Sequence, residues 1–199
     1  MSDILGNITN LASLYQYSWD QLQRAALDPK HAFREICLAT SDEGEAVDQR
    51  MVILRFAQRS SATIHVYSDV RAAKIAQIRA NSSVHILAWD SRKRLQIRCK
   101  ATATLHHNDR LSQQAWQSLS TNARSLYSAD PAPGKVVSLS EGFAAYEHQP
   151  ETDTDTWETN FGLISLQVEE MECLVLRRTK HLRARYLLSN DWKGNWLVP

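Results

Sequence analysis

The chain has 199 residues, of which 43% are hydrophobic and 23% are charged, and its formal net charge at pH 7 is +1. This length and composition are typical of a single globular domain with a few added elements. A net charge this small excludes a global field that would attract nucleic acid or an acidic membrane, so any anion binding must be local.

Cysteine, histidine and hydrophobic patterns exclude further classes. Cys37, Cys99 and Cys173 lie far apart, so neither a disulfide framework nor a zinc site is indicated. The histidines lack H-x-x-x-H and H-E-x-x-H spacing, and we expect no metal site. The start, MSDILGNITN, shows no secretory pattern, and no apolar stretch approaches the length of a membrane span. We therefore expect a cytoplasmic protein that binds neither membrane nor nucleic acid.

The first predicted element is an amphipathic helix over residues 8–27. Its apolar side chains recur at three- and four-residue spacing, which is typical of a helix with one buried face. Asp28-Pro29 follows directly, and the residue before a proline is disfavoured in the helical conformation. We therefore expect the helix to end near residue 27.

A series of short β-like runs comes next. The patterns predict strands at 33–39, 51–56, 63–67, 84–89 and 95–105, and later at 163–168, 173–176, 182–188 and 196–198. Turn-like segments separate several neighbours in this series, as expected for antiparallel hairpins. Many short antiparallel strands with a few helices indicate a barrel or a sandwich with helical additions.

Helical segments interrupt the strands. A short helix is expected up to residue 78, with Asp69 as its N-cap. Helical spacing returns after residue 109, in an insertion that we place at 109–148. The acidic segment 147–156 is expected to be a mobile loop. We expect one domain over 1–199, with the barrel formed by 33–105 and 162–199.

The stretch QRMVILRF places Arg50 and Arg55 around an apolar run that suits a buried strand. One interpretation is that both arginines reach solvent at the strand ends, with their stems along apolar surface. The other is that they bind an anion. Strand parity puts the two side chains on opposite faces unless a bulge intervenes, so they need not share a ligand.

A group of polar residues near Arg50 favours the second interpretation. A hairpin would bring Arg50 close to Ser68, Arg71 and Lys74, at the start of the next helix. Free N–H groups at a helix N-terminus bind phosphate well, although Arg71 and Lys74 would also suit a solvated surface. The convergence favours Arg50 as a phosphate ligand and leaves Arg55 for another role.

These stretches resemble the pyridoxamine 5′-phosphate oxidase superfamily. The resemblance runs in order through RMVILR (50–55), VYSDVRAAKIAQI (66–78) and RLQIRCKATA (94–103), and resumes in HLRARY (181–186) and NWLVP (195–199). It covers about half of the chain, and its order and spacing make it specific. It implies a mainly β fold with flanking α-helices: an antiparallel split β-barrel that binds FMN, with N-terminal and peripheral helices.

The resemblance also implies a set of cofactor-binding residues. FMN would be bound by the strand segment, the phosphate cluster and two distant side chains, namely Arg50, Met51, Val52, Ile53, Leu54, Arg55, Tyr67, Ser68, Arg71, Lys74, Gln96 and Arg185. Lys74 would bind the phosphate, whereas Gln96 and Arg185 would lie near the flavin ring. Members of the family are homodimers with FMN at the subunit interface, so some ligands would come from a second chain.

The sequence departs from the oxidase pattern at several positions. Arg55 stands where the oxidase has lysine, and Ala73-Lys74 replaces an Arg-Lys pair, so that Arg71 would supply the missing cation. The region 120–134 has no match to the oxidase's substrate-phosphate segment. Arg55, His181 and Arg183 are the candidate substrate residues.

We therefore expect an FMN-binding oxidoreductase related to the oxidase, acting on a small-molecule substrate that the sequence does not identify. Its catalytic residues are unassigned. One alternative is a non-catalytic protein that binds or stores flavin. Another is the same barrel binding haem or a deazaflavin.

Overall fold

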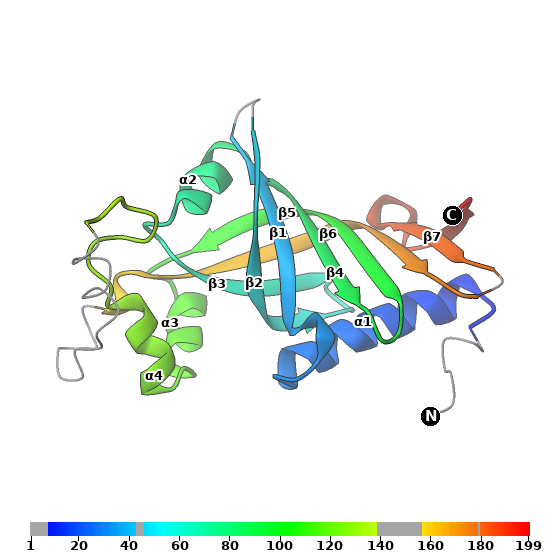
Figure 1. The fold of residues 1–199 in the computed structure, drawn as a ribbon, viewed down its shortest axis with the longest axis horizontal. Helices are drawn as coiled ribbons and strands as arrows, with labels where there is room; N and C mark the ends of the chain where they lie inside the picture. The colour runs from blue at the N-terminus through cyan, green and yellow to red at the C-terminus, as the bar shows by residue number, and fades with distance from the viewer. Residues whose placement is uncertain (1–7, 43–45, 139–156, 179) are drawn as a thin grey trace.

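The computed structural model describes residues 8–42, 46–138, 157–178 and 180–199 and contains a closed antiparallel barrel (Figure 1). The ring consists of β1 (Glu35–Ser41), β2 (Val47–Gln58), β3 (Thr63–Asp69), β4 (Ser83–Asp90), β5 (Leu95–His106) and β6 (Phe161–Val175). Its order is β3-β2-β1-β4-β5-β6, and β6 pairs back onto β3. Two further strands, β7 (Leu182–Leu187) and β8 (Gly194–Leu197), extend the sheet from β6. The expected mainly β, antiparallel barrel fold is confirmed.

The barrel encloses the hydrophobic core. Along β4 every second residue is buried, as the two-residue period of a strand requires when one face is inside. Inward side chains from five strands meet there, and all are almost completely buried: Leu38, Leu54, Ile64, Ile97 and Leu166.

The strand β6 differs from the sequence expectation. The separate strands predicted at 163–168 and 173–176 form the single strand β6. Its pairing with β5 shifts between Lys100 and Ala101, which face Glu170 and Val168 and leave Glu169 as an extra residue. This bulge and the Glu170–Lys100 ion pair at 3.2 Å accommodate the two glutamates within the strand.

Helix α1 (Leu11–Leu27) packs against the barrel with Leu14, Trp19 and Leu22 fully or almost fully buried. It begins three residues later than expected, because the Asn10 side chain accepts a hydrogen bond from the Ser13 N–H at 2.8 Å and caps the helix there. A 3-10 turn, η2 (Ala32–Arg34), leads from α1 into β1.

The remaining helices gather at the end of the molecule opposite β7 and the C-terminus (Figure 1). They are α2 (Ala73–Ala80), α3 (Arg110–Gln117), α4 (Thr121–Arg124) and the turn η3 (Ser125–Tyr127), whereas η4 (Leu188–Asn190) follows β7. The part of the expected insertion beyond residue 138, including the acidic segment 147–156, lies outside the described residues. Within the described ranges, no helix has the length and apolar character needed to cross a membrane.

Candidate functional site

A hollow of about 310 Å³ opens where β2, β3 and the start of α2 meet the segment after α3. It collects predicted cofactor residues from three separate stretches, namely Met51, Val52, Ile53, Arg55, Tyr67, Ser68 and Lys74. The rest of its wall, which the sequence analysis did not assign to the cofactor, is formed by Asp69, Ala72, Leu126, Tyr127 and Pro133. We call this the α2 hollow. Its volume is in the range of small-molecule sites, roughly 300–1,000 Å³.

One end of the α2 hollow suits an anion. The Lys74 ammonium, in the first turn of α2, donates a hydrogen bond to the buried Ser68 hydroxyl at 3.1 Å. Burial lowers the pKa of Lys74, and the positive charge of Arg50 lowers it further. The N-cap residue Ala72 lines the hollow and makes no side-chain cap. The open N-terminus of α2 therefore borders the same space as the lysine.

Arg71 is engaged by a carboxylate in the wall of this hollow. Its guanidinium binds the Asp69 side chain, with Nη2–Oδ2 at 2.7 Å, and donates to the Ala129 carbonyl at 2.8 Å. Asp69 was expected to cap α2, which is wrong, because its carboxylate accepts from the Arg71 N–H at 2.8 Å and α2 begins only at Ala73. Arg71 neutralises a carboxylate that would otherwise repel an anion, and its own phosphate contact stays a prediction.

Arg50 lies beside the α2 hollow without lining it. One guanidinium nitrogen donates to the Thr40 hydroxyl at 2.6 Å, and the other donates to the side-chain amide oxygen of Gln77 at 3.2 Å and pairs with Asp48. The structure thus brings Ser68 and Lys74 together, as expected. Its protein partners hold Arg50 beside these two residues but outside the lining of the hollow. Its role as a phosphate ligand also stays a prediction.

Arg55 lies at a bulge in β2. Leu54 pairs with Val66 and Phe56 with His65, so Arg55 is the extra residue between them. Its guanidinium lies 5.4 Å from the centre of the Tyr67 ring, and its buried Nε has no hydrogen-bond partner among the described residues. Such an orphaned donor suits a ligand atom in the hollow.

Arg34, which the sequence analysis missed, supports this bulge. Its Nη1 donates to the Leu54 carbonyl at 2.9 Å and to the Ala26 carbonyl at 2.7 Å. One guanidinium therefore ties the end of α1 to the residue that precedes Arg55. A lone arginine before a strand gives no pattern by which this contact with a distant segment could be recognised.

Aromatic side chains support the far wall of the hollow. Tyr127, Tyr67 and Trp116 surround Phe161, and the Tyr67 and Tyr127 ring centres each lie 5.1 Å from that of Phe161. Burial raises the pKa of Tyr127 to about 12 and also raises that of Tyr67. Both phenols therefore stay protonated at neutral pH and remain available as hydrogen-bond donors.

The donor set of the α2 hollow fits FMN. Lys74, Ser68 and the N-terminus of α2 suit its phosphate. The unpartnered Arg55 Nε and the aromatic wall beside Tyr67 suit the polar and planar parts of a flavin. The residues present thus match both chemical halves of the expected cofactor.

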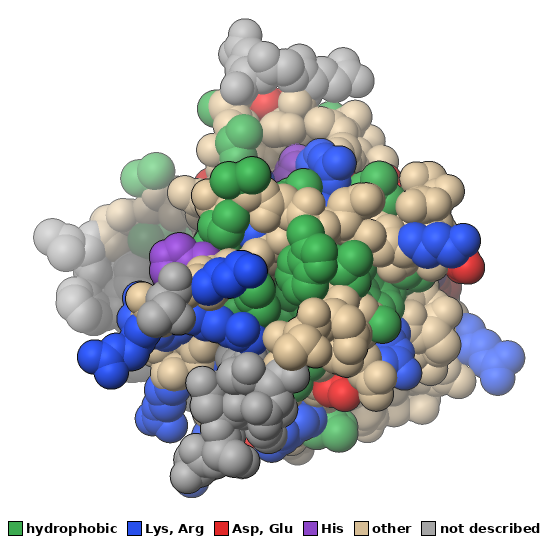
Figure 2. Space-filling model, turned by 90° about the vertical axis from the view of Figure 1, so that its right-hand side faces the viewer, with side chains coloured by type: hydrophobic (Ala, Val, Ile, Leu, Met, Phe, Trp, Pro, Cys, Tyr) green, Lys and Arg blue, Asp and Glu red, His purple; other side chains and the backbone are tan. Residues whose placement is uncertain are grey.

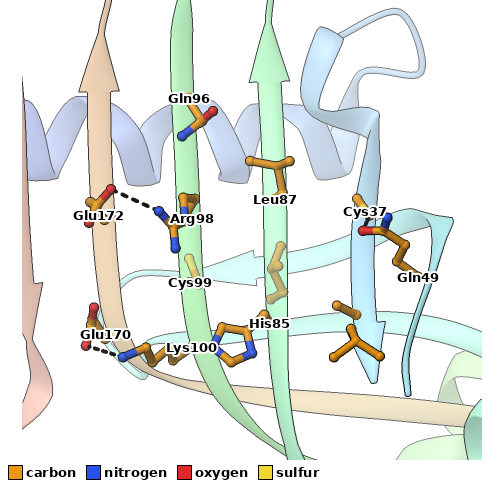
Figure 3. A pocket seen from close by; sticks show the side chains of 13 residues that line it. Cys37, Gln49, His85, Leu87, Gln96, Arg98, Cys99, Lys100, Glu170 and Glu172 are labelled. Carbon is orange, nitrogen blue, oxygen red and sulfur yellow. Dashed lines mark hydrogen bonds and ion pairs between the residues drawn. The ribbon is translucent and has the colours of Figure 1, made fainter. Parts of the chain in front are cut away.

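A second hollow, of about 470 Å³, lies on the outer face of the barrel across β1, β4, β5 and β6 (Figure 3). Gln96 lines this hollow together with Arg98 and Glu172. Figure 3 shows Gln96, Arg98 and Lys100 in a row along β5, with Glu172 and Glu170 beside them on β6. We call it the β5 hollow. Within one chain, Gln96 and Lys74 therefore line different hollows, although both were predicted to bind the cofactor.

The predicted residues near the C-terminus also lie outside the α2 hollow. The Arg183 guanidinium pairs with Glu172 at 3.1 Å. Arg185 is an exposed residue whose backbone is paired with that of Glu172. The exposed His181 accepts a hydrogen bond from the Arg177 N–H at 3.1 Å. One chain therefore does not bring these residues to Lys74, and their roles stay predictions.

Comparisons with known proteins agree with this architecture. The family described as pyridoxamine 5′-phosphate oxidase, FMN-binding domain, matches residues 16–107. No curated protein matches the chain. A pyridoxamine 5′-phosphate oxidase-related, FMN binding protein from Nostoc punctiforme is 23% identical, with a TM-score of 0.75 over 93% of this chain and 97% of that one. PhzG from Burkholderia lata is 16% identical, with a TM-score of 0.72 over 100% of this chain and 97% of that one.

The two solved structures are similar in fold, and the family match covers the chain from within α1 to just beyond β5. The same stretch supplies Lys74, Ser68, Tyr67 and Arg55 to the α2 hollow. The resemblance noted in the sequence is confirmed, and so is FMN as the cofactor of this domain type. Residues 16–107 therefore match the FMN-binding domain of the pyridoxamine 5′-phosphate oxidase family, and the chain as a whole shares its fold with the FMN binding protein from Nostoc punctiforme.

Proposed function

We propose that the protein is an FMN-dependent oxidoreductase that acts on a small molecule. The observation that carries this proposal is the α2 hollow. There the Lys74–Ser68 pair borders the open N-terminus of α2, and the unpartnered Arg55 Nε lies in the same space. A phosphate-binding end joined to an aromatic end that carries a cation is what a flavin phosphate requires.

When bound, FMN supplies the hydride or electron transfer, while the protein supplies binding and electrostatics. Lys74 and Ser68 hold the phosphate. The Arg55 cation stabilises negative charge that develops near the ring. Tyr67 and Tyr127 form a wall that excludes water from one side of the site.

The substrate side of the hollow favours a molecule without a phosphate group. Leu126, Tyr127 and Pro133 contribute apolar and aromatic surface there. Arg124, a cation from the same segment, lies over the Trp116 ring and donates to the Trp116 carbonyl at 3.2 Å. A substrate with a large, mostly apolar ring system and no phosphate fits this wall better than a vitamin B6 phosphate, and PhzG binds such a ring system in tetrahydrophenazine-1-carboxylic acid.

The first test is the absorption spectrum of the purified protein, followed by steady-state turnover. We expect a flavin spectrum, and peroxide formation with planar reduced substrates, tetrahydrophenazine-1-carboxylic acid among them. Pyridoxamine and pyridoxine 5′-phosphate should be poorer substrates. A haem or deazaflavin spectrum would contradict the proposal. A flavin spectrum without turnover on any of these compounds would favour the storage protein instead.

The second prediction concerns the phosphate. The wild-type protein should bind FMN more tightly than riboflavin, and Lys74→Ala should weaken FMN binding by about 1.5–3 kcal/mol, the usual range for a hydrogen bond to a charged group. Fluorescence titration with both flavins measures the difference. Lys30→Ala, which removes an exposed lysine elsewhere, is the matched control. Equal affinity of the wild type for FMN and riboflavin would remove the basis of the phosphate assignment.

The third prediction separates Arg55 from the phosphate site. Arg55→Ala should leave FMN affinity within about 1 kcal/mol, because a partly exposed charge contributes little once the phosphate is held. It should lower the flavin reduction potential by tens of millivolts, since about 30 mV corresponds to roughly 1.4 kcal/mol for a two-electron couple. A redox titration measures this, with Arg92→Ala on an exposed turn as control. An unchanged potential, or loss of FMN binding, would refute this role.

We further propose a homodimer in which Gln96 and Arg185 of one copy complete the α2 hollow of the other. Two observations support it: neither Gln96 nor Arg185 lines the α2 hollow of its own chain, and apolar groups are exposed in and beside the β5 hollow. Val47 is 70% exposed, Leu87 40% and Trp89 42%, and such patches mark interaction surfaces. Figure 2 shows hydrophobic side chains near the centre of the face at the β7 end of the molecule, with Lys and Arg to either side. The cytoplasmic location stays a prediction.

The fourth prediction tests this interface. The wild type should sediment as a dimer at micromolar concentration, because a permanent interface buries roughly 2,000 Å² or more. Leu87→Asp should shift it to monomer and weaken FMN binding at the same time. Leu27→Asp, at an 85% exposed position on α1, should do neither. A monomeric wild type, or a Leu87→Asp dimer with intact FMN binding, would argue against the arrangement.

A further inference from the structure

The strongest feature that the proposed function does not use is a polar network between α2 and the barrel. The side-chain amide oxygen of Gln77 (Oε1) accepts hydrogen bonds from the Thr40 hydroxyl at 2.5 Å and from Arg50 Nη2 at 3.2 Å. The Thr40 hydroxyl also accepts from Arg50 Nη1 at 2.6 Å. Three side chains from β1, β2 and α2 thus form a closed triangle.

This triangle is built into the structure. The Thr40 residue is 1% exposed, and the Arg50 side chain is 20% exposed. Every hydrogen bond in the triangle is shielded from solvent on the Thr40 side, where hydrogen bonds are stronger and an unpaired partner costs more. Asp48 pairs with Arg50 on the open side, so the charge of the arginine is balanced without any ligand.

The network lies on the face of α2 that carries Lys74. Gln77 follows Lys74 by three residues, which places both side chains on one face of the helix. The helix has only eight residues and no side-chain N-cap, and Ile75 and Ile78 are its buried anchors. Apolar contacts hold the helix on the core, but they do not fix its rotation as sharply as directional hydrogen bonds do.

We propose that Gln77 and Thr40 are positioning residues, which together with Arg50 fix the rotation of α2 and so hold the Lys74 ammonium at the phosphate site. This inference rests on the proposed function, and it gives Arg50 a part in the support of α2. Riboflavin lacks the phosphate, so loosening the network weakens FMN binding and leaves riboflavin binding unchanged.

The test is a titration of FMN and riboflavin against the full-length wild type, Gln77→Leu and Thr40→Val. We expect each substitution to reduce the preference for FMN by roughly tenfold, the scale of one hydrogen bond to a charged group. Riboflavin affinity should stay within about twofold. Arg79→Leu, at an exposed position on the same helix, should change neither affinity.

Three results would be distinguishable. A wild type that does not prefer FMN would overturn the proposed function itself. A wild type that prefers FMN, with the preference intact in both variants, would overturn only the positioning role. Loss of FMN preference in Arg50→Met but not in the other two would make Arg50 a direct phosphate ligand. Thr40→Val keeps the shape of the side chain, so it decides the question even if Gln77→Leu lowers stability.

Discussion

The pairing of β6 with β3 is the constraint on which the rest of the site depends. It closes the barrel and sets Ser68 opposite Gly162 and Asp69 opposite Phe161, at the point where β3 ends. A Cβ at Gly162 would lie 2.7 Å from the Val70 side chain, so the close approach requires glycine. Closure of the barrel therefore places the end of β3 and the start of α2 beside the aromatic wall around Phe161.

Within the part of the chain that the structure describes, some of the cationic side chains are paired with a carboxylate, whereas Lys74 is not. Arg71 is bound by Asp69, Arg50 by Asp48, and Arg183 by Glu172. Lys74 is different, because its described partner is the neutral Ser68 hydroxyl and its pKa is lowered by burial and by Arg50. A bound phosphate would stabilise the charged form of Lys74, which burial and Arg50 disfavour. At each of the three arginines, a phosphate would have to displace a carboxylate. The lysine is therefore the natural anchor of an anion.

The sequence predicted those parts of this arrangement that follow from local order. The hairpin of β2 and β3 and the helix after them put Arg55, Tyr67, Ser68 and Lys74 around one hollow, because strand register fixes which residues meet. Three features could not be predicted: the pairing of Asp69 with Arg71, the later start of α2 and the bulge in β6. Each depends on which of several nearby groups forms the more stable contact. Contacts between distant segments, such as Arg34 with Leu54, left no pattern at all.

Proton uptake on flavin binding tests the central claim, that Lys74 holds the FMN phosphate, most directly. The free protein has a Lys74 pKa below the usual value, and a bound phosphate dianion raises it, so FMN binding takes up protons in the interval between the two values and weakens as pH rises through it. Calorimetry in buffers of different ionisation enthalpy, at about pH 8–10 where the phosphate no longer titrates, should show uptake with FMN and none with riboflavin. Equal proton uptake for the two flavins would contradict the account.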